Sequence, residues 1–185
     1  FRDDFDDPAS GWETNDFQEG SIGYGEGYYV VTSIVEDQMM WGIAEMDHSD
    51  VVIEVEAAQV EAPANDNNAY GVMCRVQEND DGYALRVSGD GFYSIVLIVD
   101  NDFQYLVDWE TSPVINQGDA TNDLRVVCDG PNLALYVNGE LLAETTDATY
   151  AEGNIALTAT TFEEASTEVR FDNLVVTMGG LREEP

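Results

Sequence analysis

Clustered carboxylate and amide side chains are the residues of this sequence best suited to chemistry. The densest group comprises Asp3, Asp4, Asp6 and Asp7, and by composition we add Asp172 to it. Oxygen ligands of this kind suit a hard cation such as calcium, which takes about six to eight of them. The residues therefore predict calcium as the cofactor, with a solvated acidic turn as the alternative.

A second group of oxygen ligands lies in the loop Asn65–Asn68 and in the short segment Asn79–Asp81. Neither acidic group is an EF-hand loop, because the alternating spacing and the closing Glu are missing. In so acidic a chain, a solvated turn is again the alternative interpretation. The candidate ligands in this second group are Asp66, Asn67, Asp80 and Asp81.

Aromatic side chains favour a second kind of chemistry, the binding of carbohydrate. Flat rings stack on the C–H faces of sugars, while neighbouring Asp and Asn side chains bind the hydroxyls. The candidates are Trp109, Tyr105 and Tyr93, and Trp109 is the one we expect at the surface, since Asp108 and Glu110 flank it. The alternative is that these rings fill the core, as most aromatics of β-sheet proteins do.

Catalysis is the chemistry that the residues favour least. His48 is the single histidine and lies in a polar stretch, Met46–Asp50, that we expect to be a turn. No nucleophile and base pair with flanking motif accompanies it. Glycosidases need two facing carboxylates, a condition that some pair meets by chance in a chain with this many acids. We therefore expect no enzyme activity.

The charge balance excludes several partners. The 185 residues include 38 acidic and six basic side chains, all Arg, for a formal net charge of −32. Scattered arginines do not make a nucleic-acid or anionic-membrane surface, and the longest apolar run, Ile95–Val99, is too short for membrane insertion. The acidity fits calcium binding and a high-salt habitat equally well.

The segments that must position these side chains are predicted to be short strands along almost the whole chain. Apolar and polar residues alternate in Ile53–Ala58, and ten similar β-branched or aromatic runs follow or precede it. Asn138-Gly139 predicts a type I′ hairpin, and Ser88–Gly91 a second hairpin. No stretch keeps a helical period. We predict an all-β, two-sheet antiparallel sandwich in one domain, residues 1–178, with a tail at 179–185.

Cys74 and Cys128 each lie inside an apolar, strand-like run. In an exported protein the two would form a disulfide, whereas two buried free thiols are the alternative. The sequence begins at Phe1 rather than Met, which we interpret as a processed product, although an excised segment would look the same. Both points favour a secreted or cell-surface location.

Six segments together resemble the concanavalin A-like jelly rolls, and among these the laminin-G-like domains and bacterial extracellular modules related to keto-disaccharide hydrolases. The resemblance implies two antiparallel sheets of six or seven strands, with the N-terminal strand beside the C-terminal one. It also implies a calcium ion near that junction, where Asp3 and Asp4 would approach Asp172 and Asn173. The segments are Asp3–Trp12, Tyr70–Arg75, Asp81–Tyr83, Asp90–Ile95, Leu133–Gly139 and Val169–Val175.

This fold hosts lectins, glycanases and structural modules, so function rests on other features. The hypothesis that we rank first is a calcium-stabilised structural or adhesive module that associates with itself. Gly20–Val35 or Glu168–Met178 would then be exchanged with a neighbouring sheet edge. A carbohydrate-binding module of a larger secreted protein is the alternative, with a glycan as its partner, and a glycoside-active enzyme is the least favoured.

Overall fold

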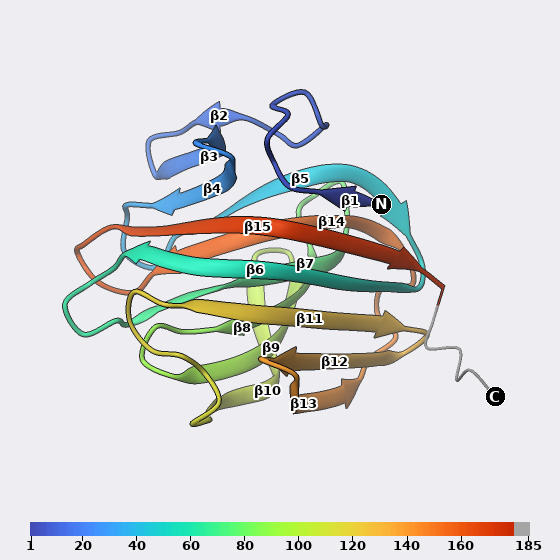
Figure 1. Cartoon of the computed structure of the whole chain (residues 1–185). Helices are drawn as coiled ribbons and strands as arrows, with labels where there is room; N and C mark the ends of the chain where they lie inside the picture. The colour runs from blue at the N-terminus through green and yellow to red at the C-terminus, as the bar shows by residue number, and fades with distance from the viewer. Residues whose placement is uncertain (180–185) are drawn as a thin grey trace.

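Two antiparallel β-sheets face each other in the computed structural model, which describes residues 1–179 (Figure 1). Among these residues there is no α-helix, and hence none long and apolar enough to cross a membrane. The all-β sandwich that the alternating pattern predicts is confirmed. The part of the predicted tail beyond residue 179 lies outside the described residues.

The larger sheet has nine strands and contains both the first strand, β1, and the last, β15. In spatial order it runs β13, β12, β11, β6, β15, β4, β3 and β2, with β1 also paired to β15. The strands are β13 (Glu140–Thr146), β12 (Asn132–Val137), β11 (Thr121–Asp129), β6 (Val51–Glu61), β15 (Thr167–Met178), β4 (Tyr28–Ser33), β3 (Gly20–Gly25), β2 (Asn15–Asp16) and β1 (Arg2–Asp3).

The smaller sheet has six strands in the order β10, β9, β8, β7, β14 and β5. Its first four strands form a meander, whereas β14 and β5 come from distant parts of the chain. The strands are β10 (Asp102–Thr111), β9 (Phe92–Val99), β8 (Gly82–Val87), β7 (Asn68–Val76), β14 (Gly153–Thr161) and β5 (Met39–His48).

The two sheets bury their faces differently. In β6 of the nine-stranded sheet, Ile53 and Val55 are buried while Glu54 and Glu56 are exposed. The outer face of this sheet is therefore exposed to solvent. The six-stranded sheet buries side chains on both faces, and every residue of β7 and β8 is buried. Its strands therefore read as nearly continuous apolar runs rather than as clean alternation.

Both predicted hairpins are present. Asn138 and Gly139 each have positive φ, 50° and 85°, and join β12 to β13 as a type I′ turn requires. The turn Ser88–Gly91 joins β8 to β9, and the Ser88 amide donates to the Phe92 carbonyl at 2.8 Å. These turns set the register of the strands that they join.

A disulfide between Cys74 and Cys128 crosses the core from β7 to β11 and so connects the two sheets. The predicted pairing of the cysteines is confirmed. Around it lies the main apolar core, which includes Tyr29, Leu85 and Phe171. The bond closes a loop with a sequence separation of 54 residues.

The first and last strands lie side by side, as the resemblance implies. Arg2 and Asp3 of β1 pair with Val175 and Leu174 of β15, and the N-terminal ammonium donates to the Val176 carbonyl at 2.8 Å. The strand β15 lies between β6 on one side and β4 with β1 on the other. Both of its edges are therefore already paired.

Four details differ from the sequence prediction. His48 ends β5 instead of lying in a turn, so the polar turn shrinks to Ser49 and Asp50. The strand β5 escaped detection because it carries apolar side chains on both faces, which hides a period of two. The segment Gly20–Val35 is a hairpin of β3 and β4 within the larger sheet rather than a segment available for exchange, and that sheet has nine strands rather than six or seven.

The outer face of the six-stranded sheet is concave. Trp109 of β10 and Phe162, which follows β14, lie four strands apart in the sheet, or roughly 19 Å on a flat surface. Their ring centroids are nevertheless 6.2 Å apart, so the sheet curves and the two rings meet over it. Beneath them lies a second apolar cluster, which includes Met73, Ala84 and Val96.

Candidate functional site

A hollow of about 490 Å³ lies at the end of the concave face where β8 turns into β9. We call it the Trp109 hollow. It combines aromatic rings with amide, hydroxyl and carboxylate groups drawn from five separate segments. It is lined by Asp37, Asn67, Asn68, Ser88, Asp90, Phe92, Tyr105, Trp109 and Phe162.

Three aromatic rings form one wall of this hollow. The Trp109 ring centroid lies 6.4 Å from that of Tyr105 and 6.2 Å from that of Phe162. Trp109 and Phe162 are half-buried, whereas the Tyr105 side chain is 46% exposed. Ring faces of this kind, partly fixed by their neighbours and partly open to water, suit the stacking of a flat ligand surface.

The polar rim is held by a chain of side-chain hydrogen bonds. Asn68 Nδ2 donates to Gln59 Oε1 at 2.7 Å, and Gln59 Nε2 donates to Asp66 Oδ1 at 2.8 Å. Gly89 lies against this chain, and a Cβ there would meet Gln59 Oε1 at 2.1 Å. A larger residue at this position would therefore have to displace the Gln59 amide and break its hydrogen bonds.

A second contact fixes the other side of the rim. Asn67 Nδ2 and Asn65 Nδ2 both donate to Glu163 Oε1, at 2.7 Å and 2.8 Å. The two amides lower the pKa of the Glu163 carboxyl below its ordinary value. The loop before β7 is thereby tied to the loop after β14, and the rim is preorganised.

Arg86 lies under the aromatic wall. Its guanidinium carbon is 4.9 Å from the Trp109 ring centroid and 5.8 Å from that of Phe103, and the residue is 2% exposed. Its Nη2 donates to Ser94 Oγ at 3.2 Å, while Nε has no hydrogen-bond partner. Burial lowers the pKa of this guanidinium, and the nearby Tyr105 offsets the effect in part.

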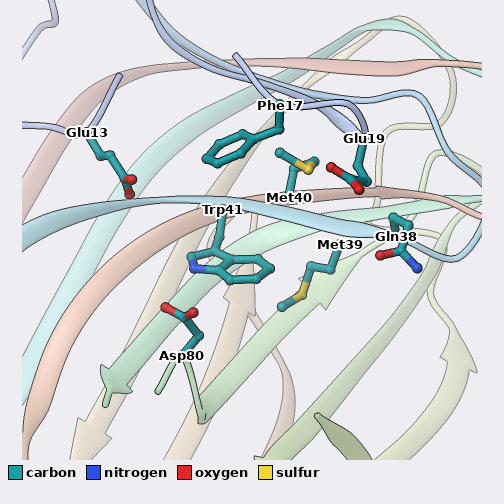
Figure 2. A pocket seen from close by; sticks show the side chains of 8 residues that line it. All are labelled: Glu13, Phe17, Glu19, Gln38, Met39, Met40, Trp41 and Asp80. Atoms are coloured by element: carbon teal, nitrogen blue, oxygen red, sulfur yellow. The ribbon is translucent and has the colours of Figure 1, made fainter. Parts of the chain in front are cut away.

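A second, smaller hollow of about 340 Å³ lies around Trp41 on β5 (Figure 2). Trp41 and Phe17 are the aromatic residues of its lining, and three of its four polar side chains are carboxylates. No contact between the Trp41 and Phe17 rings is found among the described residues, whereas in the Trp109 hollow the Trp109 ring contacts those of Tyr105 and Phe162. It is lined by Glu13, Phe17, Glu19, Gln38, Met39, Met40, Trp41 and Asp80.

Two of the three aromatics predicted to bind carbohydrate share the Trp109 hollow. Trp109 and Tyr105 lie side by side on β10. Tyr93, 7% exposed, instead packs in the core between the sheets and donates its hydroxyl to Glu110 Oε2 at 3.0 Å. Its ring is not offered to a ligand, because β9 turns alternate residues inward and Tyr93 is on the inner side.

The first predicted metal group is brought together only in part. Asp3, Asp4 and Asn173 line one hollow of about 560 Å³, whereas Asp172 lines a different one. The Asp3 carboxylate already accepts hydrogen bonds from the Phe5 amide at 2.9 Å and from the Trp12 indole at 3.1 Å. A calcium ion would have to compete with both donors, so the fit of this site is poor.

The second predicted metal group is divided between the two ends of β7. Asp66 and Asn67 precede the strand and lie by the Trp109 hollow, whereas Asp80 and Asp81 follow it. Asp81 accepts hydrogen bonds from Tyr150 and Asn79. Within residues 1–179, no three or more His, Cys, Asp or Glu side chains are grouped to hold a metal ion.

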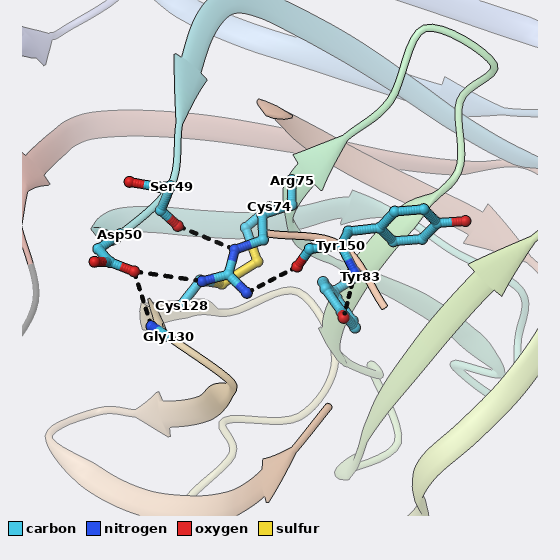
Figure 3. Close-up of polar contacts among 8 residues, drawn as sticks. All are labelled: Ser49, Asp50, Cys74, Arg75, Tyr83, Cys128, Gly130 and Tyr150. Atoms are coloured by element: carbon cyan, nitrogen blue, oxygen red, sulfur yellow. Dashed lines mark hydrogen bonds and ion pairs between the residues drawn. A yellow bond between two sulfur atoms is a disulfide. The ribbon is translucent and has the colours of Figure 1, made fainter. Parts of the chain in front are cut away.

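The other end of β7 carries a compact polar cluster beside the disulfide (Figure 3). Arg75 donates to the Ser49 carbonyl and to the Tyr150 carbonyl, both at 3.0 Å, and pairs with Asp50 at 3.6 Å. Asp50 also accepts from the Gly130 amide at 2.8 Å. The guanidinium thus joins three segments of backbone, which is a structural role.

Sequence reasoning missed the residues that complete the Trp109 hollow. Arg86 and Phe162 were not proposed for any site, and Asn68 was considered only as part of a metal-binding loop. For Arg86 a signal was available, because a single charged residue interrupts the apolar strand Tyr83–Val87. Phe162 gave no signal, since only the curvature of the sheet brings it to Trp109.

Several solved structures with carbohydrate-related names have a similar fold. The carbohydrate-binding module CBM66 from Bacillus subtilis matches with TM-score 0.65 and 18% identity, covering 90% of this chain and 94% of that one. A Bacillus subtilis protein with a galectin-like fold matches with TM-score 0.68 and 12% identity, covering 96% and 94%. A GlcNAcα1-4Gal-releasing endo-β-galactosidase from Clostridium perfringens matches with TM-score 0.65 and 11% identity, covering 95% and 61%.

At these identities the likenesses show the fold, a concanavalin A-like jelly roll. A comparison with curated proteins gave no match. The family model of the 3-keto-alpha-glucoside-1,2-lyase-like domain, in contrast, matches residues 1–177, nearly the whole chain. The chain therefore belongs to the family of 3-keto-alpha-glucoside-1,2-lyase-like domains.

Proposed function

We propose that this domain binds carbohydrate in the Trp109 hollow, as a non-catalytic module of an extracellular protein. The observation that carries the proposal is the wall of Trp109, Tyr105 and Phe162 facing a rim of amides and carboxylates. Aromatic faces take the apolar side of a sugar ring, and polar groups around them take its hydroxyls.

Preorganisation supports the same function. The Asn68, Gln59 and Asp66 chain and the Asn67 to Glu163 bond fix the rim before any ligand arrives. A fixed rim lowers the entropy cost of binding. The disulfide and the carbohydrate-related fold relatives support an extracellular location, where such ligands occur.

A glycoside-active enzyme is the second candidate. The family description and the endo-β-galactosidase likeness favour it. In the hollow its acid and base would be Asp37 and Asp90, the two carboxylates of the lining. Asp90 accepts a hydrogen bond from Ser88. Replacing both by Asn distinguishes the candidates, since an enzyme would lose turnover and a binding module would retain most of its affinity.

The test of the first candidate is a glycan array followed by titration of the best ligand. We expect Trp109→Ala to weaken binding roughly tenfold to a hundredfold, as loss of a central aromatic contact does. Trp41→Ala, which removes the ring of the smaller hollow, is the matched control and should bind normally. Equal affinity of the wild type and Trp109→Ala would rule out this site.

Calcium binding and self-association remain predictions from the sequence. Calcium has the Asp3 and Asp4 hollow as its candidate site. Association by strand exchange would have to break existing pairs, because β3 lies between β4 and β2 and β15 is paired on both sides. Electron microscopy with calcium and with a chelator tests both, and monodisperse particles in each condition would contradict a polymer.

A further inference from the structure

Arg86 projects from the concave face of the six-stranded sheet, toward the aromatic wall of the Trp109 hollow. Its neighbours Leu85 and Val87 point into the main core, whereas Ala84 belongs to the cluster on the outer face. Side chains alternate along a strand, so Arg86 and Ser88 share the outer side of β8. Ser88 lines the hollow, and Arg86 is the next outward residue along the strand.

The charge of Arg86 is not neutralised within the described residues. Arg75, Arg125 and Arg170 each pair with a carboxylate, yet none of the ion pairs in residues 1–179 includes Arg86. It is nevertheless 2% exposed, and its Nε donates to no acceptor. A buried cation without a counter-charge is costly. With 38 acidic residues in the chain, a carboxylate partner was readily available to evolution.

The cover over Arg86 is the part of the sheet best placed to move. Trp109, Phe103 and Tyr105 all belong to β10, which pairs with β9 alone at the sheet edge. The register of that pairing shifts between Tyr105 and Val107 and again before Glu110. An edge strand with two irregularities opens more readily than an inner strand.

A second buried polar atom without a partner faces the same way. Thr160 is 3% exposed and its Oγ1 has no hydrogen-bond partner. It lies on the outer side of β14, since Ala159 points into the main core, and it is two residues before Phe162 of the hollow. The concave face thus holds an unused donor and an unused hydroxyl.

We propose that the Trp109 hollow selects anionic sugars, whose carboxylate or sulfate group pairs with Arg86 once the aromatic cover shifts. The inference rests on the proposed function and narrows it to one class of glycan. A planar guanidinium with five donors matches either oxyanion and supplies the charge that a neutral sugar does not use. The wall of Trp109 and Tyr105 would then stack on the ring that bears the anion.

The competing explanation is structural, with Arg86 serving as a cationic support for Trp109 and Phe103. The two explanations differ for Arg86→Met, which fills the space without the charge. If Arg86 binds the anionic group of a ligand, the variant melts no lower than the wild type and binds anionic ligands more weakly. If Arg86 is a support, the variant melts lower and any ligand binds as before.

The experiment uses the purified chain and three sets of oligosaccharides: neutral, uronate-containing and sulfated, with carboxyl-reduced forms of the uronates. Titrations run at low salt and at about 1 M NaCl, where the screening length falls to about 3 Å and long-range repulsion by the protein is removed. Arg125→Met is the matched control, because Arg125 also stacks on a ring, that of Tyr136 at 4.8 Å, but lies on the other sheet.

We expect binding of a uronate or a sulfated glycan, with carboxyl reduction or Arg86→Met weakening it roughly tenfold or more and Arg125→Met leaving it unchanged. Which of the two anionic sets binds identifies the oxyanion. Binding of neutral glycans that is equal to or tighter than that of anionic ones would overturn the inference and leave the proposed function standing. Binding of no glycan in any set would overturn both.

Discussion

Arg75 and Arg86 lie on adjacent strands of one sheet and are both almost fully buried, at 1% and 2% exposure, yet they have opposite surroundings. Arg75 meets two backbone carbonyls and Asp50 beside the disulfide. Arg86 meets two ring faces and one serine hydroxyl. The difference separates an end of the sandwich that is built for stability from an end that has unused binding capacity.

The largest predicted change in stability comes from the end of the sandwich that contains Arg75 and the disulfide, which we call the stable end. Replacing Cys74 and Cys128 by Ala removes the bond between the sheets, and the loop it closes has a sequence separation of 54 residues. We expect a loss of about 4 kcal/mol in the free energy of unfolding, by the chain-entropy account. Denaturant unfolding of the wild type and the double variant measures it. An unchanged denaturation midpoint would mean that the disulfide does not stabilise this end of the sandwich.

The two arginines themselves give the next largest difference. Arg75→Met leaves the Ser49 and Tyr150 carbonyls without their donor and should cost about 2 to 3 kcal/mol. Arg86→Met should leave stability unchanged or raise it by about 1 kcal/mol, because it removes an unpaired buried charge at the cost of one hydrogen bond, that to the Ser94 hydroxyl. Thermal unfolding of the two variants side by side checks this. Equal losses would erase the distinction between the two ends.

The stable end should also respond to acid. Burial acts to raise the pKa values of Asp81 and Asp147, but hydrogen bonds outweigh it and hold both below the ordinary 3.8. For Asp81 the donors are two backbone amides with Asn79 and Tyr150, and for Asp147 they are Tyr83 and Thr149.

Carboxylates with lowered folded pKa values stabilise the protein above the unfolded pKa, and that stability is lost as the pH falls through the folded pKa. The wild type should therefore exceed the Asp81→Asn, Asp147→Asn double variant in stability at neutral pH, with a gap that closes below about pH 3.8. Urea midpoints across pH measure the gap. Asp119→Asn, at an exposed position, is the control, and a gap that is constant with pH would contradict the assignment.

The smallest effect that we predict is that of calcium. A site at Asp3 and Asp4 would raise the melting temperature in calcium beyond that in sodium of equal ionic strength, by the linkage of binding to folding. The donors that already occupy Asp3 limit the gain to a few degrees at most. Equal melting in both salts would leave high-salt adaptation as the explanation of the acidity.

The sequence predicted the fold well because the fold depends on local signals. Alternation located β6 and β11, Asn138-Gly139 located a hairpin, and the cysteines paired across the core. The strand β5 was missed because both of its faces are apolar.

The candidate site was predictable only in part. Trp109 and Tyr105 stand four residues apart on one strand, a spacing that the sequence displays. Phe162 reaches them because the sheet curves, and Arg86 is distinguished by having no counter-charge. Both features are properties of the tertiary structure. The acidic clusters, in contrast, predicted a grouping that the tertiary structure does not produce. Asp66 and Asp81, which the sequence suggested as ligands of one group, lie at opposite ends of β7.

The most direct test of glycan binding at the Trp109 hollow is a titration followed by the indole N–H signals of the three tryptophans, Trp12, Trp41 and Trp109. Trp12 is buried and bonded to Asp3, Trp41 lies in the smaller hollow, and Trp109 lies in the larger one. We predict that the best glycan shifts the Trp109 signal and leaves that of Trp12 unchanged. A ligand that shifts the Trp41 signal while Trp109 stays fixed would contradict the account.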